Sequence, residues 1–149
     1  LLHDGAPPAT GSDAEIVIYD TPPNLEHTST TVAVMNADIT LVITTPSPAD
    51  VWEANEAMRF AAERQVSGTR TVVFNKVRKS TILGRLVDQG SSLDCPVLTA
   101  RLSSRECFQH ALVQGWKALD SAAREEVLQL GLAVLSLNGT GERAQTAAS

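Results

Sequence analysis

Four short apolar runs alternate with longer stretches of helical spacing, and this alternation constrains the fold more than any other feature of the sequence. Each run is rich in Val, Ile, Leu or Thr and almost continuously apolar, which is typical of strands covered on both faces. The order of the elements predicts an α/β fold in which a mostly parallel sheet of about four strands carries helices on both faces. The runs cover residues 15–20, 38–45, 69–76 and 95–102.

The stretches between the runs carry start and stop signals of helices. A capping box at residues 47–50, with proline at the first helical position, predicts a helix to about Gln65, and Gly68 follows as its terminator. A second capping box at 103–106 predicts a helix that ends at Gly115. Asp120 is expected to cap a third helix, and weaker patterns predict helices over 28–36 and 81–89. The second of these helices is expected to place Phe108, Ala111 and Leu112 on one side, and the third to turn Val127, Leu128, Leu132 and Leu135 inward.

Length and composition indicate one globular domain. The chain has 149 residues, and we expect a single α/β domain over 15–137, between a flexible leader over 1–14 and a disordered tail over 138–149. The net charge of −5 excludes an overall basic field for wrapping nucleic acid, although a local basic patch is compatible with it. No apolar run approaches the roughly 20 residues of a membrane-spanning helix. The spacing of the two cysteines does not suggest a metal site, and we expect a cytoplasmic protein with reduced thiols.

Polar residues follow the predicted strands, where ligands bind in parallel sheets. The run Ile16–Tyr19 ends on Asp20, and Thr21, Pro22 and Pro23 follow. An apolar strand that ends in aspartate is the Walker B pattern, in which a carboxylate holds hydrated Mg²⁺ against nucleotide phosphates. Two prolines restrict the following loop to few conformations, as in a switch. An aspartate that caps a turn, with prolines that only lead the chain out of the sheet, explains the same residues.

Two further features are compatible with ligand binding. Asn75 and Lys76 close the third run, and an amide at this place offers both a donor and an acceptor to a base edge. Arg78, Lys79 and Arg85 form a basic cluster that suits phosphates. Turn asparagines are common after strands, however, and a solvated helix start explains the basic residues equally well. The histidines are too far apart in the sequence to suggest a metal site.

Taken together, these segments resemble the C-terminal half of a ParA/MinD-type P-loop ATPase, the family of plasmid and chromosome partition proteins. The resemblance runs from about Glu15 to Leu137. It rests on the order and spacing of its segments, of which none is decisive alone. They are IVIYDTPP, ADITLVITTPSPADVWEANEA, VVFNKVRKSTILGRLV and LTARLSSRECFQHALVQGWKALD.

One departure from the family is large. The glycine-rich Walker A loop with its lysines, which defines the family, does not occur in the 149 residues. Without its backbone amides and lysine to hold the phosphates, this chain alone is expected to bind ATP poorly and to hydrolyse it negligibly. In the family's fold, the strand of that loop lies beside the Walker B strand. Its absence predicts an open sheet edge and self-association of the chain.

The resemblance implies roles for particular residues. Asp20 would be the catalytic carboxylate that binds Mg²⁺ through water, and Thr21, Pro22 and Pro23 would form the switch. Asn75 and Lys76 would contact the nucleotide, with Leu102, Ser103 and Arg105 bordering the base. Arg78, Lys79 and Arg85 would contact DNA.

Two hypotheses remain open at this stage. In the first, the chain is part of a partition ATPase that binds ATP·Mg²⁺, forms homo-oligomers, binds DNA nonspecifically at the nucleoid and works with a DNA-bound partner protein. In the second, it is a shortened, non-catalytic relative that acts as an interaction or dimerisation module. The persistence of Asp20, Asn75 and the Pro-Pro segment favours the first, and the short leader favours the second. No membrane-targeting helix is evident at the C-terminal end.

Overall fold

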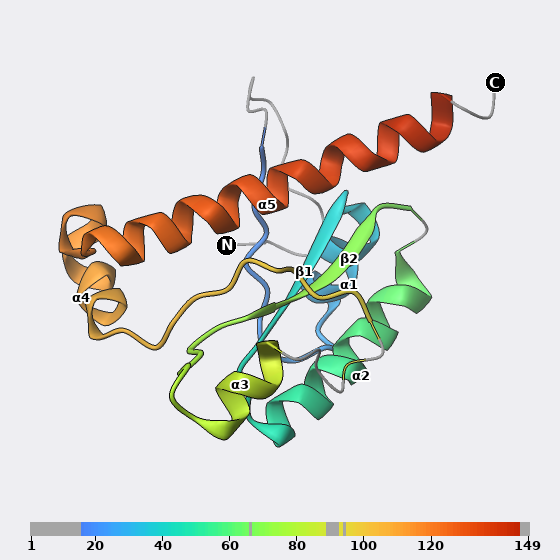
Figure 1. The fold of residues 1–149 in the computed structure, drawn as a ribbon. Helices are drawn as coiled ribbons and strands as arrows, with labels where there is room; N and C mark the ends of the chain where they lie inside the picture. The colour runs from blue at the N-terminus through green and yellow to red at the C-terminus, as the bar shows by residue number, and fades with distance from the viewer. Residues whose placement is uncertain (1–15, 66, 89–92, 94, 147–149) are drawn as a thin grey trace.

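The computed structural model describes residues 16–65, 67–88, 93 and 95–146, and it has a mixed α/β architecture (Figure 1). Its two strands, β1 (Ile39–Thr44) and β2 (Thr69–Phe74), are parallel and pair along their whole length. Both lie within the second and third apolar runs, so these strand predictions are confirmed. Parallel pairing requires a crossover, which α2 (Pro48–Arg64) provides.

The predictions of strands over 15–20 and 95–102 are not confirmed within the described residues. Residues 16–24 have no regular secondary structure. Residues 95–103 follow the second edge of β2 but form only isolated bridges, Val72 to Val97 and Val77 to Ser103. The Pro96 carbonyl accepts a hydrogen bond from the Val72 amide. Proline has no N–H to donate back to β2, so the regular series of strand hydrogen bonds is interrupted there. An apolar run predicts a segment that packs well in a sheet. It becomes a strand only if its backbone forms hydrogen bonds with a neighbouring strand.

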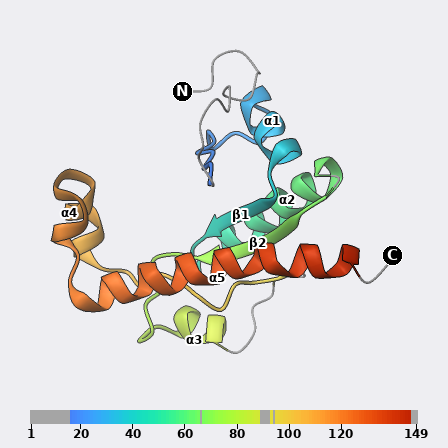
Figure 2. The same ribbon diagram turned by 90° about the horizontal axis from the view of Figure 1, so that it is seen from above.

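Helices cover both faces of this small sheet. α2 packs against both strands on one face, with α1 (Thr28–Asn36) beside it, and α5 (Ser121–Thr146) crosses the other face (Figures 1 and 2). The described elements also include α3 (Ile82–Asp88), α4 (Glu106–Gln114) and the 3₁₀ turn η1 (Gly115–Ala118). The core lies between α2 and the sheet and contains Ala54, Met58, Val72, Phe74, Val77 and Leu93.

The two predicted capping boxes do not form. Ser47 stands at the N-cap of α2 but makes no side-chain capping bond; instead Thr45 Oγ1 donates to the Asp50 carboxylate and accepts from the Ser47 amide. α4 has Arg105 at its N-cap, because the Ser103 side chain bonds elsewhere. Capping by Asp120 is confirmed, since its Oδ1 accepts a 2.7 Å hydrogen bond from the Ala123 amide.

Most of the leucines expected in the core are exposed. Leu128, Leu132 and Leu135 on α5 are 51–66% exposed, so their assignment to the core is wrong, and Leu112 on α4 is 88% exposed. The reason is geometric. A helix of 26 residues is about 39 Å long, whereas two paired strands span only about 10 Å, so the sheet covers one part of one face of α5. α5 also continues to Thr146, into the segment 138–149 for which disorder was expected, and the expected leader over 1–14 lies outside the described residues.

Candidate nucleotide-base site

The carboxyl ends of β1 and β2 meet at one edge of the sheet. The Asn75 amide donates a 2.7 Å hydrogen bond to the Thr44 carbonyl, which joins the two strand ends directly. Lys76 has φ +54°, a left-handed conformation, and its amide donates to Asn75 Oδ1 at 2.8 Å. This bond fixes the Asn75 side chain and uses an acceptor site on its oxygen, while its NH₂ group supplies two donors.

A pocket of about 400 Å³ opens beside these residues, within the usual size range of small-molecule sites. The loop after β2 forms one side, and the segment leading into α4 forms the other. The basic groups Lys76 and Arg78 come from the first side and Arg105 from the second, and the apolar wall comes from α4. Its lining residues are Asn75, Lys76, Arg78, Ser103, Ser104, Arg105, Phe108, Gln109 and Leu112.

A second hollow of about 310 Å³ continues from the first. The two share Lys76, Arg78 and Ser104, so basic side chains stand between them. The second hollow reaches the loop between β1 and α2 and the start of α3. Its other lining residues are Thr45, Pro46, Ser47, Thr81 and Leu83.

Glu126 on α5 holds the far side of the pocket in place. Its carboxylate accepts hydrogen bonds from the Ser103 amide and the Ser103 hydroxyl, both at 2.8 Å, and from Arg105 Nη2 at 3.0 Å. Arg105 also lies 3.8 Å from the Asp120 carboxylate. Partial burial alone would raise the pKa of Glu126, but the bonds from Ser103 and Arg105 outweigh it and the pKa lies below its ordinary value. The pocket wall is therefore tied to α5 by charge-assisted hydrogen bonds.

Replacement of Glu126 by glutamine tests this support. We expect the free energy of unfolding of the variant to fall by about 1 kcal/mol at pH 7. The substitution removes the charged partner of Arg105, while the amide oxygen still accepts a hydrogen bond from Ser103. A lowered carboxyl pKa stabilises the fold above the unfolded value, about pH 4.3, and that stability is lost as the pH falls through the folded pKa. Thermal unfolding between pH 3 and 7 measures both effects, and the difference between variant and wild type should shrink at the acid end. Glu125→Gln, one residue away and exposed, is the control; an equal loss in both would contradict the assignment.

The structure brings most of the predicted nucleotide-binding residues together. Asn75, Lys76, Ser103 and Arg105 line the same pocket, although α4 and β2 are far apart in the sequence. Leu102 does not line it; its amide donates to the Phe74 carbonyl. Of the basic cluster, Arg78 lines both hollows, whereas Lys79 and Arg85 are exposed beside α3 and line neither.

Several residues of the pocket were missed by sequence reasoning. The helical spacing places Phe108 and Leu112 on one side of α4, but it gives no signal that this side forms a pocket wall. Gln109 and Ser104 carry no motif signal. Glu126 lies 23 residues after Ser103, so the carboxylate that anchors the pocket could be recognised only once α5 was placed.

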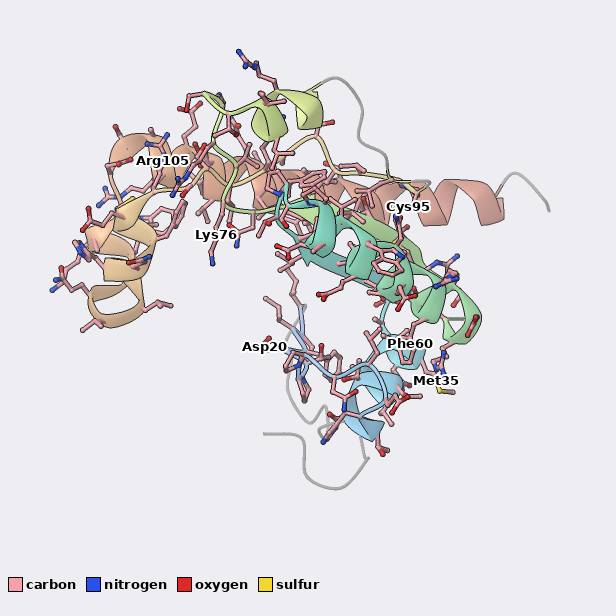
Figure 3. All side chains as sticks on the ribbon, turned by 90° about the horizontal axis from the view of Figure 1, so that it is seen from below. Asp20, Met35, Phe60, Lys76, Cys95 and Arg105 are labelled. Atoms are coloured by element: carbon pink, nitrogen blue, oxygen red, sulfur yellow. The ribbon has the colours of Figure 1, made fainter. Side chains whose placement is uncertain are left out.

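Asp20 stands apart from the pocket. It lies on the segment before α1 and away from Lys76 and Arg105 (Figure 3), and it lines neither hollow. Thr21, Pro22 and Pro23 are exposed next to it. The described residues contain no group of three His, Cys, Asp or Glu side chains that could hold a metal ion. Within the described residues no further His, Cys, Asp or Glu side chain completes a metal site at Asp20, so we derive no hydrolytic step.

The comparisons with known proteins give one distant relative to report. The chain is 24% identical over 114 residues to the Maintenance of carboxysome distribution protein A of Halothiobacillus neapolitanus, covering 74% of this chain and 53% of the relative. The chain thus spans about half the length of the curated relative it matches. No protein-family model matches the chain, and no solved structure matches it significantly. None of the described helices is long and apolar enough to cross a membrane.

Proposed function

We propose that the chain is a base-binding and DNA-contacting portion of a ParA-like positioning or partition ATPase, with an incomplete P-loop fold. One observation carries the proposal: Asn75, Lys76, Ser103 and Arg105, chosen from a family resemblance, line one pocket at the carboxyl edge of a parallel sheet. The relative named for maintaining carboxysome distribution supports a role in positioning cargo. The full sheet of about four strands belongs to this proposal as the fold of the intact ATPase, with the runs 15–20 and 95–102 among its strands.

The pocket suits a base better than a phosphate chain. The Asn75 amide offers donors to a base edge, and Phe108 and Leu112 supply an apolar wall. Basic side chains are present, but the 149 residues contain no Walker A loop whose successive amides would hold phosphates. In the assembled ATPase, Mg²⁺ would neutralise the phosphates with Asp20 as its carboxylate. This chain alone is expected to bind neither ATP nor Mg²⁺ tightly and to lack hydrolytic activity.

A titration with adenosine and with ATP·Mg²⁺ tests the base site. We expect both ligands to bind weakly, in the millimolar range, and ATP to bind no more than about tenfold tighter, a difference of 1.4 kcal/mol. Backbone amide shifts of Asn75, Ser103 and Arg105 in NMR spectra report the site. Asn75→Ala should abolish the shifts, whereas Asn36→Ala, exposed on α1, should leave them unchanged. If neither ligand shifts these amides at about 10 mM, tenfold above a millimolar dissociation constant, the base site is refuted.

The same proposal assigns DNA contacts to Arg78, Lys79 and Arg85, which are all exposed near α3. Because each phosphate contact contributes about 0.9 to the salt slope, reversal of all three charges is expected to lower that slope by about 3 and to weaken binding. Fluorescence anisotropy with a duplex of arbitrary sequence, at several salt concentrations, measures it. An unchanged slope would remove the assignment, and the DNA-bound partner protein would then need another surface.

The second candidate function is a non-catalytic interaction module. The observation that favours it is the number of large apolar side chains exposed on the described elements. Leu112, Val113 and Trp116 are 49–89% exposed around α4 and η1, and α5 adds Leu128, Leu132 and Leu135. Exposed apolar residues of this extent are typical of surfaces that bind other proteins.

A further inference from the structure

The outer edge of β1 is open to another strand. The amides of Thr69 and Asn75 donate to the carbonyls of Asp38 and Thr44, at 2.8 and 2.7 Å, so the even-numbered residues of β1 bond to β2. Backbone groups alternate along a strand, and those of the odd-numbered residues Ile39, Leu41 and Ile43 therefore point to the opposite edge. Within the described part of the chain, the sheet consists of β1 and β2 alone.

A segment suited to that edge stands exposed in the same chain. Ile16, Val17 and Ile18 are 62%, 42% and 87% exposed, and they have no regular secondary structure. All three are β-branched, the residue type most favoured in strands. Exposed apolar side chains on an extended segment are costly in water, and pairing with a sheet edge satisfies both the side chains and the backbone.

The chain holds this segment away from its own β1. Asn24 forms a turn at the start of α1: its Oδ1 accepts from the Glu26 amide at 2.9 Å, and its carbonyl accepts from Thr30 Oγ1 at 3.1 Å. The segment before this turn lies apart from β1 (Figure 2). Pairing with a second copy leaves this turn intact, whereas pairing with β1 of the same copy requires the segment to swing across.

We take the added strand to run in the direction of the existing β1–β2 pair, which is parallel. In a parallel arrangement Asp20 comes to the carboxyl edge of the sheet, where the exposed side chains of Lys76 and Arg78 lie. In an antiparallel arrangement Asp20 comes to the other edge, next to the exposed Asp38 that precedes β1. The parallel arrangement therefore places the Asp20 carboxylate at an edge that carries opposite charges.

We propose that residues 16–20 of one copy add as a parallel strand to the outer edge of β1 in a second copy. Reciprocal exchange gives a closed dimer with two equivalent strand pairs, because each copy carries both the segment and the edge. The dimer brings Asp20 of one copy to the edge where Lys76 of the other lies. This inference does not depend on the nucleotide or DNA assignments above.

Light scattering after size-exclusion chromatography tests the association on the full chain. We expect a dimer fraction that rises with concentration, and Ile18→Glu should raise the dimer dissociation constant at least tenfold. Ile18 is 87% exposed in the monomer, so its replacement costs the monomer fold little. Leu41→Pro should have the same effect, because it removes an amide that β2 does not use. Ile82→Glu, at a position on α3 that is 70% exposed and lines neither hollow, is the matched control and should leave the constant unchanged.

A disulfide test identifies the paired segments. With Asp20 level with Thr45, Ile18 lies opposite Ile43 on the neighbouring strand, within disulfide distance. A mixture of Ile18→Cys and Ile43→Cys chains should form a cross-linked dimer beyond the background of wild type, which contains Cys95 and Cys107. Three results would each overturn the proposal. The wild type could be monomeric, a chain carrying both Ile18→Cys and Ile43→Cys could form the cross-link within itself, or the dimer could be lost with Leu132→Glu but kept with Ile18→Glu.

Discussion

Truncation of Phe74 to alanine is expected to destabilise the fold by about 3–5 kcal/mol. Phe74 is the last residue of β2 and is 1% exposed, one of the three largest fully buried side chains of the described core together with Val72 and Val77. It packs in the cluster that joins α2 to the sheet. Because domains of this size are stable by about 5–15 kcal/mol, the loss is a large fraction of the total.

Urea unfolding followed by far-UV circular dichroism measures the Phe74 effect. The transition midpoint should fall sharply, and the truncated chain should be partly unfolded in buffer if the wild type is near the lower limit of stability. Phe60→Ala is the control, since Phe60 is half-buried on α2 and stacks against the Arg64 guanidinium 3.7 Å away. We expect a cost of about 1–2 kcal/mol there. Equal costs at both positions would show that the α2–sheet cluster is not the main core.

The parts of the fold that follow from local sequence were predictable. α1 covers the residues expected of it, and α2 begins at Pro48 and ends one residue before Gln65, because proline at the first turn and the terminating Gly68 act within a few residues. Gly68 has φ +102°, a conformation that favours glycine. β1 and β2 were recognisable because strands covered on both faces are almost continuously apolar.

The parts that depend on distant partners were not predictable in the same way. Ser103 has the pattern of a helix cap, but the Glu126 carboxylate accepts hydrogen bonds from both its amide and its hydroxyl and holds the residue against α5 instead. Leu128 and Leu132 have the spacing of a buried face, but the described sheet is too narrow to cover them. The family resemblance singled out Asn75, Ser103 and Arg105, which line one pocket, whereas the α4 wall and Glu126 became recognisable only from the packing of α4 and α5.

For Gly84→Ala, helix propensity predicts a gain in stability, whereas the tertiary structure predicts a loss. In an isolated helix, alanine is more favourable than glycine by about 1 kcal/mol. A Cβ atom at Gly84, however, would overlap the Arg78 carbonyl oxygen and lie 2.7 Å from its carbon. That carbonyl accepts hydrogen bonds from the Thr81 amide at 3.0 Å and the Thr81 hydroxyl at 2.8 Å, so it cannot move without breaking the turn that begins α3.

We therefore expect Gly84→Ala to destabilise the region by about 1–3 kcal/mol, the usual cost of overpacking. The effect should be local, because α3 is a short helix at the periphery: amide hydrogen exchange should accelerate in residues 82–85, while β2 stays protected. Gly131→Ala on α5 is the matched control, since a Cβ there meets no atom within 4 Å and helix propensity alone predicts a gain of up to about 1 kcal/mol. Opposite signs for the two substitutions would confirm that the Arg78 carbonyl packs directly on α3. A gain at both positions would show that α3 does not rest on that turn, and the hollow lined by Thr81 and Leu83 would then lose one of its walls.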